Sequence, residues 1–228
     1  GPVLISFTGI DTILPFVIGA LVLAIATIPI FFVKDENIEG EDEDPLSVIG
    51  FIRKAPILLI AVGMFAVIDA ANLSFLPVYG VKKGLDQATA SLALTAFIVG
   101  NTVLQFPIGW LADHFRKRWV MAGCGVVTAC AIALIPLSFE TWAFWPLLTI
   151  TGAASAGIYT VSLAELGERF SGHELVTGTA SFSTTWGLGA LLGSLIAGWS
   201  MHSFGADGLP YSMALIFALF LVVMVTRE

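Results

Sequence analysis

Long apolar runs constrain this chain more than any other feature of its sequence. They predict seven segments near residues 12–33, 56–80, 87–111, 118–139, 142–165, 175–203 and 209–226. Each is close to or above the length of about 20 residues that a helix needs to cross the hydrocarbon core of a bilayer. Hydrophobic residues make up 57% of the chain and charged residues 12%, whereas about a quarter of an average soluble domain is charged. The sequence therefore predicts a polytopic membrane protein.

Helices rather than strands are expected in these segments. A membrane β-barrel requires polar and apolar residues to alternate, but runs such as 16–33 and 214–225 are apolar on every face. The predicted fold class is an all-α helical bundle. The spans take up so much of the chain that a large extramembrane catalytic domain is excluded. A nucleic-acid partner is also excluded, because it would need a basic surface and the net charge is −7.

The basic residues predict which side of the membrane each loop faces. Eight of the ten lie in loops on one side, and this excess marks the cytoplasmic side. The C-terminus is then cytoplasmic, and the residues before the first span lie outside. We expect that earlier spans precede this sequence, with residues 1–7 as the outer end of a preceding helix. The eight residues are Lys34, Arg53, Lys54, Arg116, Lys117, Arg118, Arg169 and Arg227, against Lys82 and Lys83 on the other side.

An acidic segment divides the chain. Seven of its 17 carboxylates lie between Asp35 and Asp44, and such a run cannot bury apolar surface. We interpret residues 34–55 as a cytoplasmic linker between two membrane bundles, with residues 1–33 on one side and 56–228 on the other. A calcium loop is disfavoured, because the run lacks the regular spacing of ligands that calcium loops have.

A short motif follows the third span. Residues 105–118 read QFPIGWLADHFRKR. This segment resembles the cytoplasmic signature of the major facilitator superfamily, Gly-x-Leu-Ala/Ser-Asp-Arg/Lys-x-Gly-Arg/Lys-Arg/Lys. A positive loop that only fixes orientation would explain the basic residues, but not the others in this register. The matching residues are Gly109, Leu111, Ala112, Asp113, Lys117 and Arg118.

Each part of the motif has a physical rationale. Gly109 allows two helices to approach closely, and Asp113 can accept hydrogen bonds from a neighbouring helix N-terminus. The basic cluster is expected next to anionic membrane lipid. The motif departs from the family pattern at two positions. His114 stands where Arg or Lys is usual, and Arg116 stands where glycine is usual. A residue other than glycine would be strained there if the turn required a positive φ.

The resemblance implies an architecture of twelve helices in two halves joined by a long cytoplasmic loop. Residues 1–33 then correspond to the end of helix five and to helix six, and residues 56–228 to helices seven to twelve, so about seven of the twelve helices are present. Two strings, residues 76–80 (LPVYG) and 186–190 (WGLGA), are similar to bacterial drug- or sugar-efflux-like members of unassigned substrate. This implies a location in the bacterial inner membrane. With the first half missing, we expect the isolated chain to be inactive in transport.

Asp69 is the most informative single residue. It lies near the middle of span 56–80, where an Asp costs about 2.5–3.5 kcal/mol on insertion scales. Asn72 and Tyr79 fall on roughly the same helix face. The functional hypothesis is a cavity-facing carboxylate that binds substrate or carries a proton. The alternative is a structural acid bonded to a neighbouring helix.

Four further polar residues are candidates for the same cavity. Asn101 and Gln105 are an i,i+4 pair in the next span, and such amides equally often join helices to one another. Tyr159 and Trp186 offer aromatic and polar groups at mid-depth. Neighbouring hydroxyls, such as those of residues 181–185, commonly bond to their own backbone.

Small residues in the span 175–203 are interpreted as helix packing. Gly189 and Gly193 form a G-x-x-x-G pair, and Ala197 continues the same face. A phosphate-binding loop is disfavoured, because no Gly-Lys-Ser/Thr follows. No cofactor is expected. No metal site is expected either, since the three histidines are scattered at span edges: His114, His173 and His202.

The resemblance implies secondary active transport of a small molecule by alternating access. Our preferred hypothesis is proton-coupled efflux through Asp69, with protons and the missing N-terminal half as partners. Two alternatives remain open. One is a non-transporting receptor or assembly protein built on a transporter fold. The other is a polytopic membrane enzyme acting on lipid, which would need a nucleophile with a base, or a metal cluster, at one depth.

Overall fold

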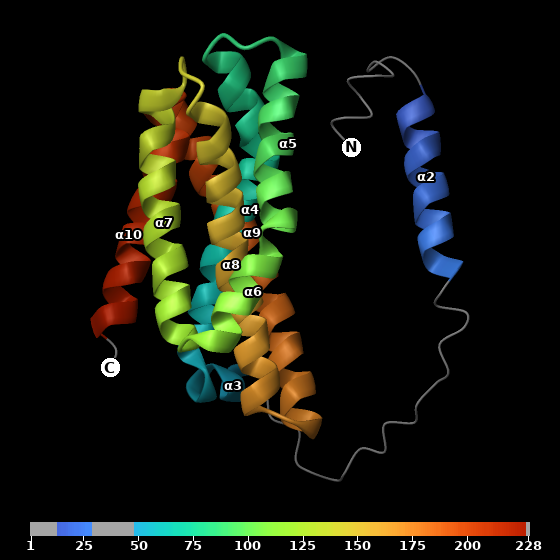
Figure 1. Ribbon diagram of the computed structural model, residues 1–228, viewed down its shortest axis with the longest axis vertical. Coiled ribbons are helices and arrows are strands. Elements are labelled where there is room, and N and C mark those ends of the chain that lie inside the picture. The colour runs from blue at the N-terminus through green and yellow to red at the C-terminus, as the bar shows by residue number, and fades with distance from the viewer. Residues whose placement is uncertain (1–12, 29–47, 227–228) are drawn as a thin grey trace. The chain divides into compact units, whose positions relative to one another are not determined.

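The computed structural model describes residues 13–28 and 48–226, and within these ranges every regular element is a helix (Figure 1). Helix α2 (Leu14–Thr27) belongs to a separate unit and is described by itself. The other helices form one unit, and their bounds are α3 Val48–Lys54, α4 Pro56–Lys82, α5 Gln87–Val103, α6 Gln105–His114, α7 Lys117–Ser138, α8 Phe144–Arg169, α9 Gly172–Ser203 and α10 Gly208–Thr226.

Six antiparallel crossings make up this unit. Helices α4, α7, α8, α9 and α10 each make one crossing, and α5 together with α6 makes the remaining one (Figure 1). Five of the six crossings are long and apolar enough to span a bilayer, and α10 contributes a shorter apolar stretch over 208–222. Each predicted span thus contains a helix, and the all-α fold class is confirmed.

The span predicted as one helix over 87–111 consists of two. Helix α5 ends at Val103 and α6 begins at Gln105, so the helix is interrupted at Leu104. Pro107 explains the break, because it has no N–H to donate to the Val103 carbonyl and its ring crowds that carbonyl. The two helices still follow one another closely, since Ile108 N donates to the Leu104 carbonyl at 3.4 Å.

The part of the predicted linker that the structure describes is helical. Residues 48–54 form α3, whose Phe51 is fully buried and contacts the ring of Phe170 at 5.0 Å. Lys54 at the end of α3 pairs with Glu174 at the start of α9. This end of the linker is therefore packed on the bundle, while residues 29–47, which hold the acidic run, lie outside the described residues.

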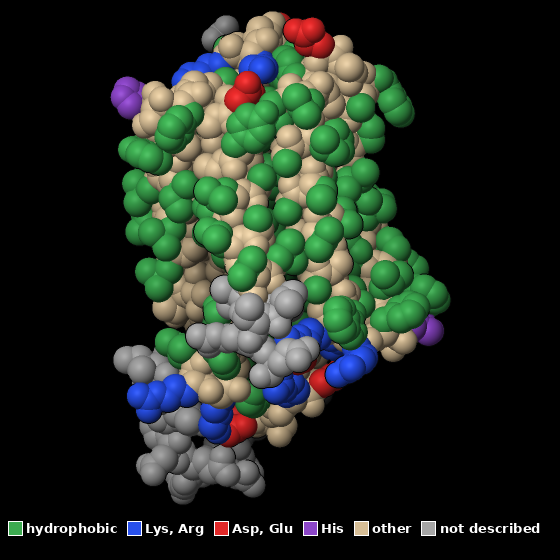
Figure 2. All heavy atoms as spheres, turned by 90° about the vertical axis from the view of Figure 1, so that its left-hand side faces the viewer, with side chains coloured by type: hydrophobic (Ala, Val, Ile, Leu, Met, Phe, Trp, Pro, Cys, Tyr) green, Lys and Arg blue, Asp and Glu red, His purple; other side chains and the backbone are tan. Residues whose placement is uncertain are grey.

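Charged side chains gather at the two ends of the bundle. In Figure 2 the blue and red side chains lie at the top and bottom of the visible face, and apolar side chains cover the region between them. The turns after α6 and α8 lie at the same end as α3, and the turn after α4 lies at the other (Figure 1). For the eight basic residues that the structure describes, the predicted division therefore corresponds to the two ends of one helical bundle, while Lys34 and Arg227 lie outside the described residues.

Glycines bring pairs of helices into backbone contact. A Cβ on Gly193 of α9 would lie 2.1 Å from the Val67 carbonyl oxygen of α4, and one on Gly189 would lie 2.6 Å from the Gly63 carbonyl oxygen. Ala197, one turn further along α9, is fully buried. Only a residue without a side chain, or with a very small one, fits these positions.

A second close contact joins α5 to α8. A Cβ on Gly100 would lie 1.9 Å from the Thr149 carbonyl oxygen, and one on Gly152 would lie 2.0 Å from the Phe97 carbonyl oxygen. Each helix thus offers a glycine to a carbonyl of the other. This contact fixes the height of α5 against α8, and both helices carry polar residues of the candidate site.

We predict that Gly193→Leu destabilises the bundle by about 3 kcal/mol, the upper end of overpacking costs. The reason is that the new side chain cannot fit against Val67 unless α9 moves away from α4. Unfolding followed by circular dichroism in detergent measures the effect. Gly187→Leu is the matched control, because a Cβ at Gly187 on the same helix has nothing within 4 Å. Equal stability of the two variants would contradict the prediction.

Candidate functional site

A chain of hydrogen bonds begins at Asp69 in the middle of α4. The Asp69 side chain is buried, with 8% of the residue exposed. Its Oδ1 accepts a hydrogen bond from Nδ2 of Asn101 on α5 at 3.2 Å. The structure therefore joins the intramembrane acid to a polar residue of the adjacent helix.

The series of hydrogen bonds continues across the break between α5 and α6. The side-chain amide of Gln105 donates to the Asn101 carbonyl at 2.7 Å. Its Oε1 accepts a hydrogen bond from the Thr160 hydroxyl of α8. Helices α4, α5, α6 and α8 are thus linked by one polar chain through Asp69, Asn101, Gln105 and Thr160.

This arrangement has the chemistry of a polar binding or proton-exchange site. A carboxylate accepts hydrogen bonds when ionised and can donate one when protonated, and a side-chain amide can serve either state. Polar groups at this depth are expensive in hydrocarbon unless they are paired. The two amides and the hydroxyl supply partners, and they do so from helices that the glycine contacts hold in register.

The other candidates that the sequence suggested lie outside this series of hydrogen bonds. Asn72 donates to the Ile68 carbonyl of its own helix at 2.8 Å and lines a small cavity beside α7 and α10. Tyr159 packs on Phe65, with ring centroids 5.2 Å apart. Trp186 is 39% exposed on α9. The nearby hydroxyls of residues 181, 183 and 184 bond to their own backbone.

The motif residues lie at the end of α6 and the start of α7. Ala112 is buried and Leu111 is exposed. Gly109 has no described atom within 4 Å of its Cβ position, so the close helix approach expected there is not made by the described residues. Asp113 is exposed, and its carboxylate makes no hydrogen bond or ion pair with a described residue, although a helix N-terminus was expected as its donor.

The turn is formed without the usual glycine. Arg116 has φ −61° and ψ 118°, which any residue adopts readily. The substitution of arginine for glycine therefore brings no backbone strain. Lys117, at the start of α7, places its Nζ 2.8 Å from both carboxylate oxygens of Glu168 near the end of α8. A cation is unfavourable at the positive N-terminus of α7, and an anion is unfavourable at the negative C-terminus of α8. The ion pair between Lys117 and Glu168 offsets both of these costs. Arg118 also contributes to this surface, on the rim of a polar pocket that contains Glu165 and Arg169.

Comparison with known proteins agrees with this geometry. The profile of the Major Facilitator Superfamily matches residues 58–228. The chain belongs to this superfamily. It is therefore an integral membrane protein, as the resemblance of the 105–118 segment implied.

Among the relatives of this chain are transporters whose names assign no substrate. The chain is 24% identical over 223 residues to the uncharacterized MFS-type transporter YfkF of Bacillus subtilis, covering 94% of this chain and 56% of that protein. It is 25% identical over 224 residues to the uncharacterized MFS-type transporter YcaD of Shigella flexneri and of Escherichia coli K12, covering 97% of this chain and 57% of each relative. The chain thus spans about half the length of the curated relatives it matches.

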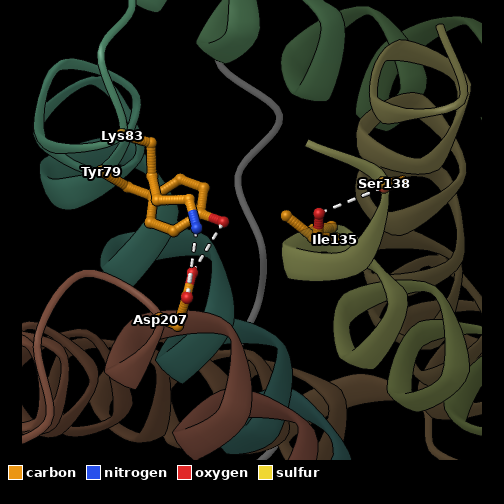
Figure 3. Close-up of polar contacts among 5 residues, drawn as sticks. All are labelled: Tyr79, Lys83, Ile135, Ser138 and Asp207. Atoms are coloured by element: carbon orange, nitrogen blue, oxygen red, sulfur yellow. Dashed lines mark hydrogen bonds and ion pairs between the residues drawn. The ribbon is translucent and has the colours of Figure 1, made fainter. Parts of the chain in front are cut away.

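Sequence reasoning missed a cluster at the end of the bundle opposite α3. Figure 3 shows Tyr79 of α4 and Lys83, the residue after α4, pointing toward Asp207 in the turn between α9 and α10. The Tyr79 hydroxyl donates to Asp207 Oδ1 at 3.2 Å, and Lys83 Nζ lies 3.2 Å from Oδ2. Both also contact the Phe139 ring after α7, Tyr79 edge-on at 5.6 Å and Lys83 through its cation at 5.4 Å. Because Asp207 lies 128 residues after Tyr79 and 124 after Lys83, no local pattern could have predicted the cluster.

Within the described part of the chain, no group of three His, Cys, Asp or Glu residues is placed to hold a metal ion. Thr160, which links Gln105 to α8, is a member of the candidate site that sequence reasoning did not select. Its neighbour Tyr159 was selected because of its aromatic ring.

We predict that Asp207→Ala destabilises the bundle by about 1–3 kcal/mol, because it leaves the buried Tyr79 hydroxyl without its acceptor. Asp207→Asn should cost less, since it keeps an acceptor for Tyr79 and removes only a partly exposed ion pair. Thermal unfolding in detergent measures both. If Tyr79→Phe in the Asp207→Ala background restores none of the lost stability, the hydroxyl does not account for the loss.

Proposed function

We propose that this chain is part of a secondary active transporter that moves a small molecule across a bacterial inner membrane by alternating access. The observation that supports this most is the polar chain from Asp69 to Thr160. It places an ionisable group and two amides deep within the crossings of a superfamily bundle. Intramembrane ionisable residues typically mark substrate or proton pathways.

The domain arrangement forms part of the proposal. Residues 56–228 would be the C-terminal bundle of six helices, residues 34–55 a cytoplasmic linker, and residues 1–33 part of the N-terminal half. The C-terminus would be cytoplasmic, in agreement with the basic residues at the α3 end of the bundle. The rest of the N-terminal half would supply the other wall of the substrate cavity, so the isolated chain would not transport. The match to about half the length of the curated relatives supports this arrangement.

Coupling to protons is assigned to Asp69. In the proposed transporter, Asp69 would line the cavity between the two bundles, and its carboxylate, hydrogen-bonded to Asn101, would exchange a proton as that cavity opens to each side. The proposed direction is efflux, and the proposed activity is transport rather than enzymatic catalysis. Gln105 and Asn101 would hold Asp69 in position, with Asn72, Tyr159 and Trp186 as further candidates for substrate contact.

The motif would control the conformational change. Asp113 lies exposed at the membrane edge with no partner among the described residues, and Gly109 beside it leaves open space. We propose that a segment of the other bundle packs on Gly109 and donates to Asp113 in one of the two transport states. Lys117 would hold the turn in place through its ion pair with Glu168. Arg118 would help to do so from the pocket that it lines together with Glu165 and Arg169.

We predict that Asp69→Asn in the full-length transporter abolishes uptake driven by a pH gradient. The amide keeps an acceptor for Asn101 but cannot carry a proton at neutral pH. Proteoliposomes with an imposed pH gradient provide the measurement. Undiminished coupling in this variant would remove Asp69 from the mechanism.

The matched control for that experiment is Asp86→Asn. Asp86 caps α5 outside the membrane span and accepts a hydrogen bond from the Thr89 N–H at 3.1 Å. Hydrogen bonds from Thr89 lower the pKa of Asp86, so it stays ionised at neutral pH and exchanges no proton there. Because Asn caps helices about as well as Asp, this variant should keep full coupling.

We predict that Asp113→Asn lowers the transport rate at saturating substrate by about tenfold, the loss expected when one charge-assisted hydrogen bond is weakened. The substrate KM should change little, because Asp113 lies away from the polar chain. Kinetics of full-length transporter in proteoliposomes separate the two quantities. Asp113→Glu should recover part of the rate, and a change in KM alone would contradict the proposed role.

A further inference from the structure

An apolar groove runs between α6, α7 and α8 on the half of the bundle nearest α3. It has a volume of about 590 Å³, within the range of small-molecule sites. Aliphatic and aromatic side chains provide nearly all of its lining. Residues that define it include Leu104, Pro107, Leu111, Gly123, Val127 and Ala154.

The groove exists because of two features of the sequence. The break at Leu104 separates α5 from α6, and both Leu104 and Pro107 face the groove. Gly123 of α7 lies on its wall, and a Cβ there would have nothing within 4 Å. A larger side chain at position 123 would therefore project into this groove.

The groove ends at a basic turn. Phe115 and Trp119 line it at the end of the helices, and Trp119 is 66% exposed. Aromatic side chains of this kind are enriched at the membrane–water interface. Arg116 lies between them in the chain and is exposed, and its side chain makes no hydrogen bond or ion pair with a described residue. A cationic group thus lies at the level of the lipid headgroups, directly beyond an apolar recess.

We propose that this groove binds one anionic phospholipid, with an acyl chain in the recess and its phosphate at the turn that carries Arg116. An acyl chain is the occupant that the surroundings supply, since the groove lies on the membrane-spanning part of an integral membrane protein. Burial of the acyl chain alone gives little selectivity between lipids, because the bilayer is as apolar as the groove. Selection therefore depends on the charge of the headgroup, and a basic turn favours a negative one.

Photocrosslinking tests the proposal without requiring transport. The 228-residue chain is reconstituted in phosphatidylcholine vesicles that contain a diazirine-labelled acyl chain on either phosphatidylglycerol or phosphatidylcholine, at the same mole fraction. Labelled peptides are then mapped by mass spectrometry. We expect the phosphatidylglycerol probe to label the groove peptides, around residues 104–127 and 150–154, several-fold more than the phosphatidylcholine probe.

Two variants test the two parts of the site separately. Gly123→Phe fills the recess and should abolish the excess labelling by phosphatidylglycerol. Arg116→Gln should lower that excess about fivefold, the effect expected for removing one cation near an anionic headgroup. Arg116 lies in an exposed turn, so this second variant remains informative if Gly123→Phe fails to fold.

The controls keep residue type and change location. Val126→Phe adds a ring on the same helix at an exposed position that does not line the groove, and Lys82→Gln removes a cation at the opposite end of the bundle. Both should retain the full excess. Equal labelling by the two probes would overturn the proposal in favour of ordinary surrounding lipid. Labelling of the groove peptides by neither probe, with labelling elsewhere on the bundle retained, would overturn it in favour of a protein contact over the groove.

Discussion

Backbone contact between helices is the interaction on which the rest of this structure depends. In a bilayer the hydrophobic effect does not drive helices together, because lipid tails are as apolar as leucine side chains. Helices associate instead where they fit closely, and here glycine positions on α9, α5 and α8 lie against carbonyl groups of α4, α8 and α5. These contacts determine which polar residues meet. Asn101 reaches Asp69 because α5 is held at one height between α4 and α8.

The break at Leu104 connects the fold to both sites. It results from one proline, yet it places Gln105 so that its side chain bonds to the carbonyl of Asn101 and to Thr160 of α8. On the other side of the same break, Leu104 and Pro107 form the wall of the apolar groove. A change at Pro107 would therefore act on the polar chain and the groove together, although it touches neither carboxylate nor cation.

Much of this architecture could be predicted from the sequence because hydrocarbon imposes strong rules. The length of the apolar runs gave each crossing to within a few residues, and the 105–118 segment pointed to the superfamily. Asp69, Asn101 and Gln105 were identifiable because polar residues are rare in such spans. Their hydrogen bonds were not, since these depend on the rotation and height of separate helices. Thr160 could not be separated from other hydroxyls of the spans, and the break at Leu104 was missed because apolar composition continues through it.

The cluster of Tyr79, Lys83 and Asp207 has a consequence for where water can enter. Tyr79 is fully buried, and the cavity beneath it, bounded by α4, α7 and α10, has a volume of about 10 Å³, enough for a single water molecule at most. The Tyr79 ring and the Lys83–Asp207 ion pair thus leave room for little water between α4, α7 and α10 at the end of the bundle away from α3.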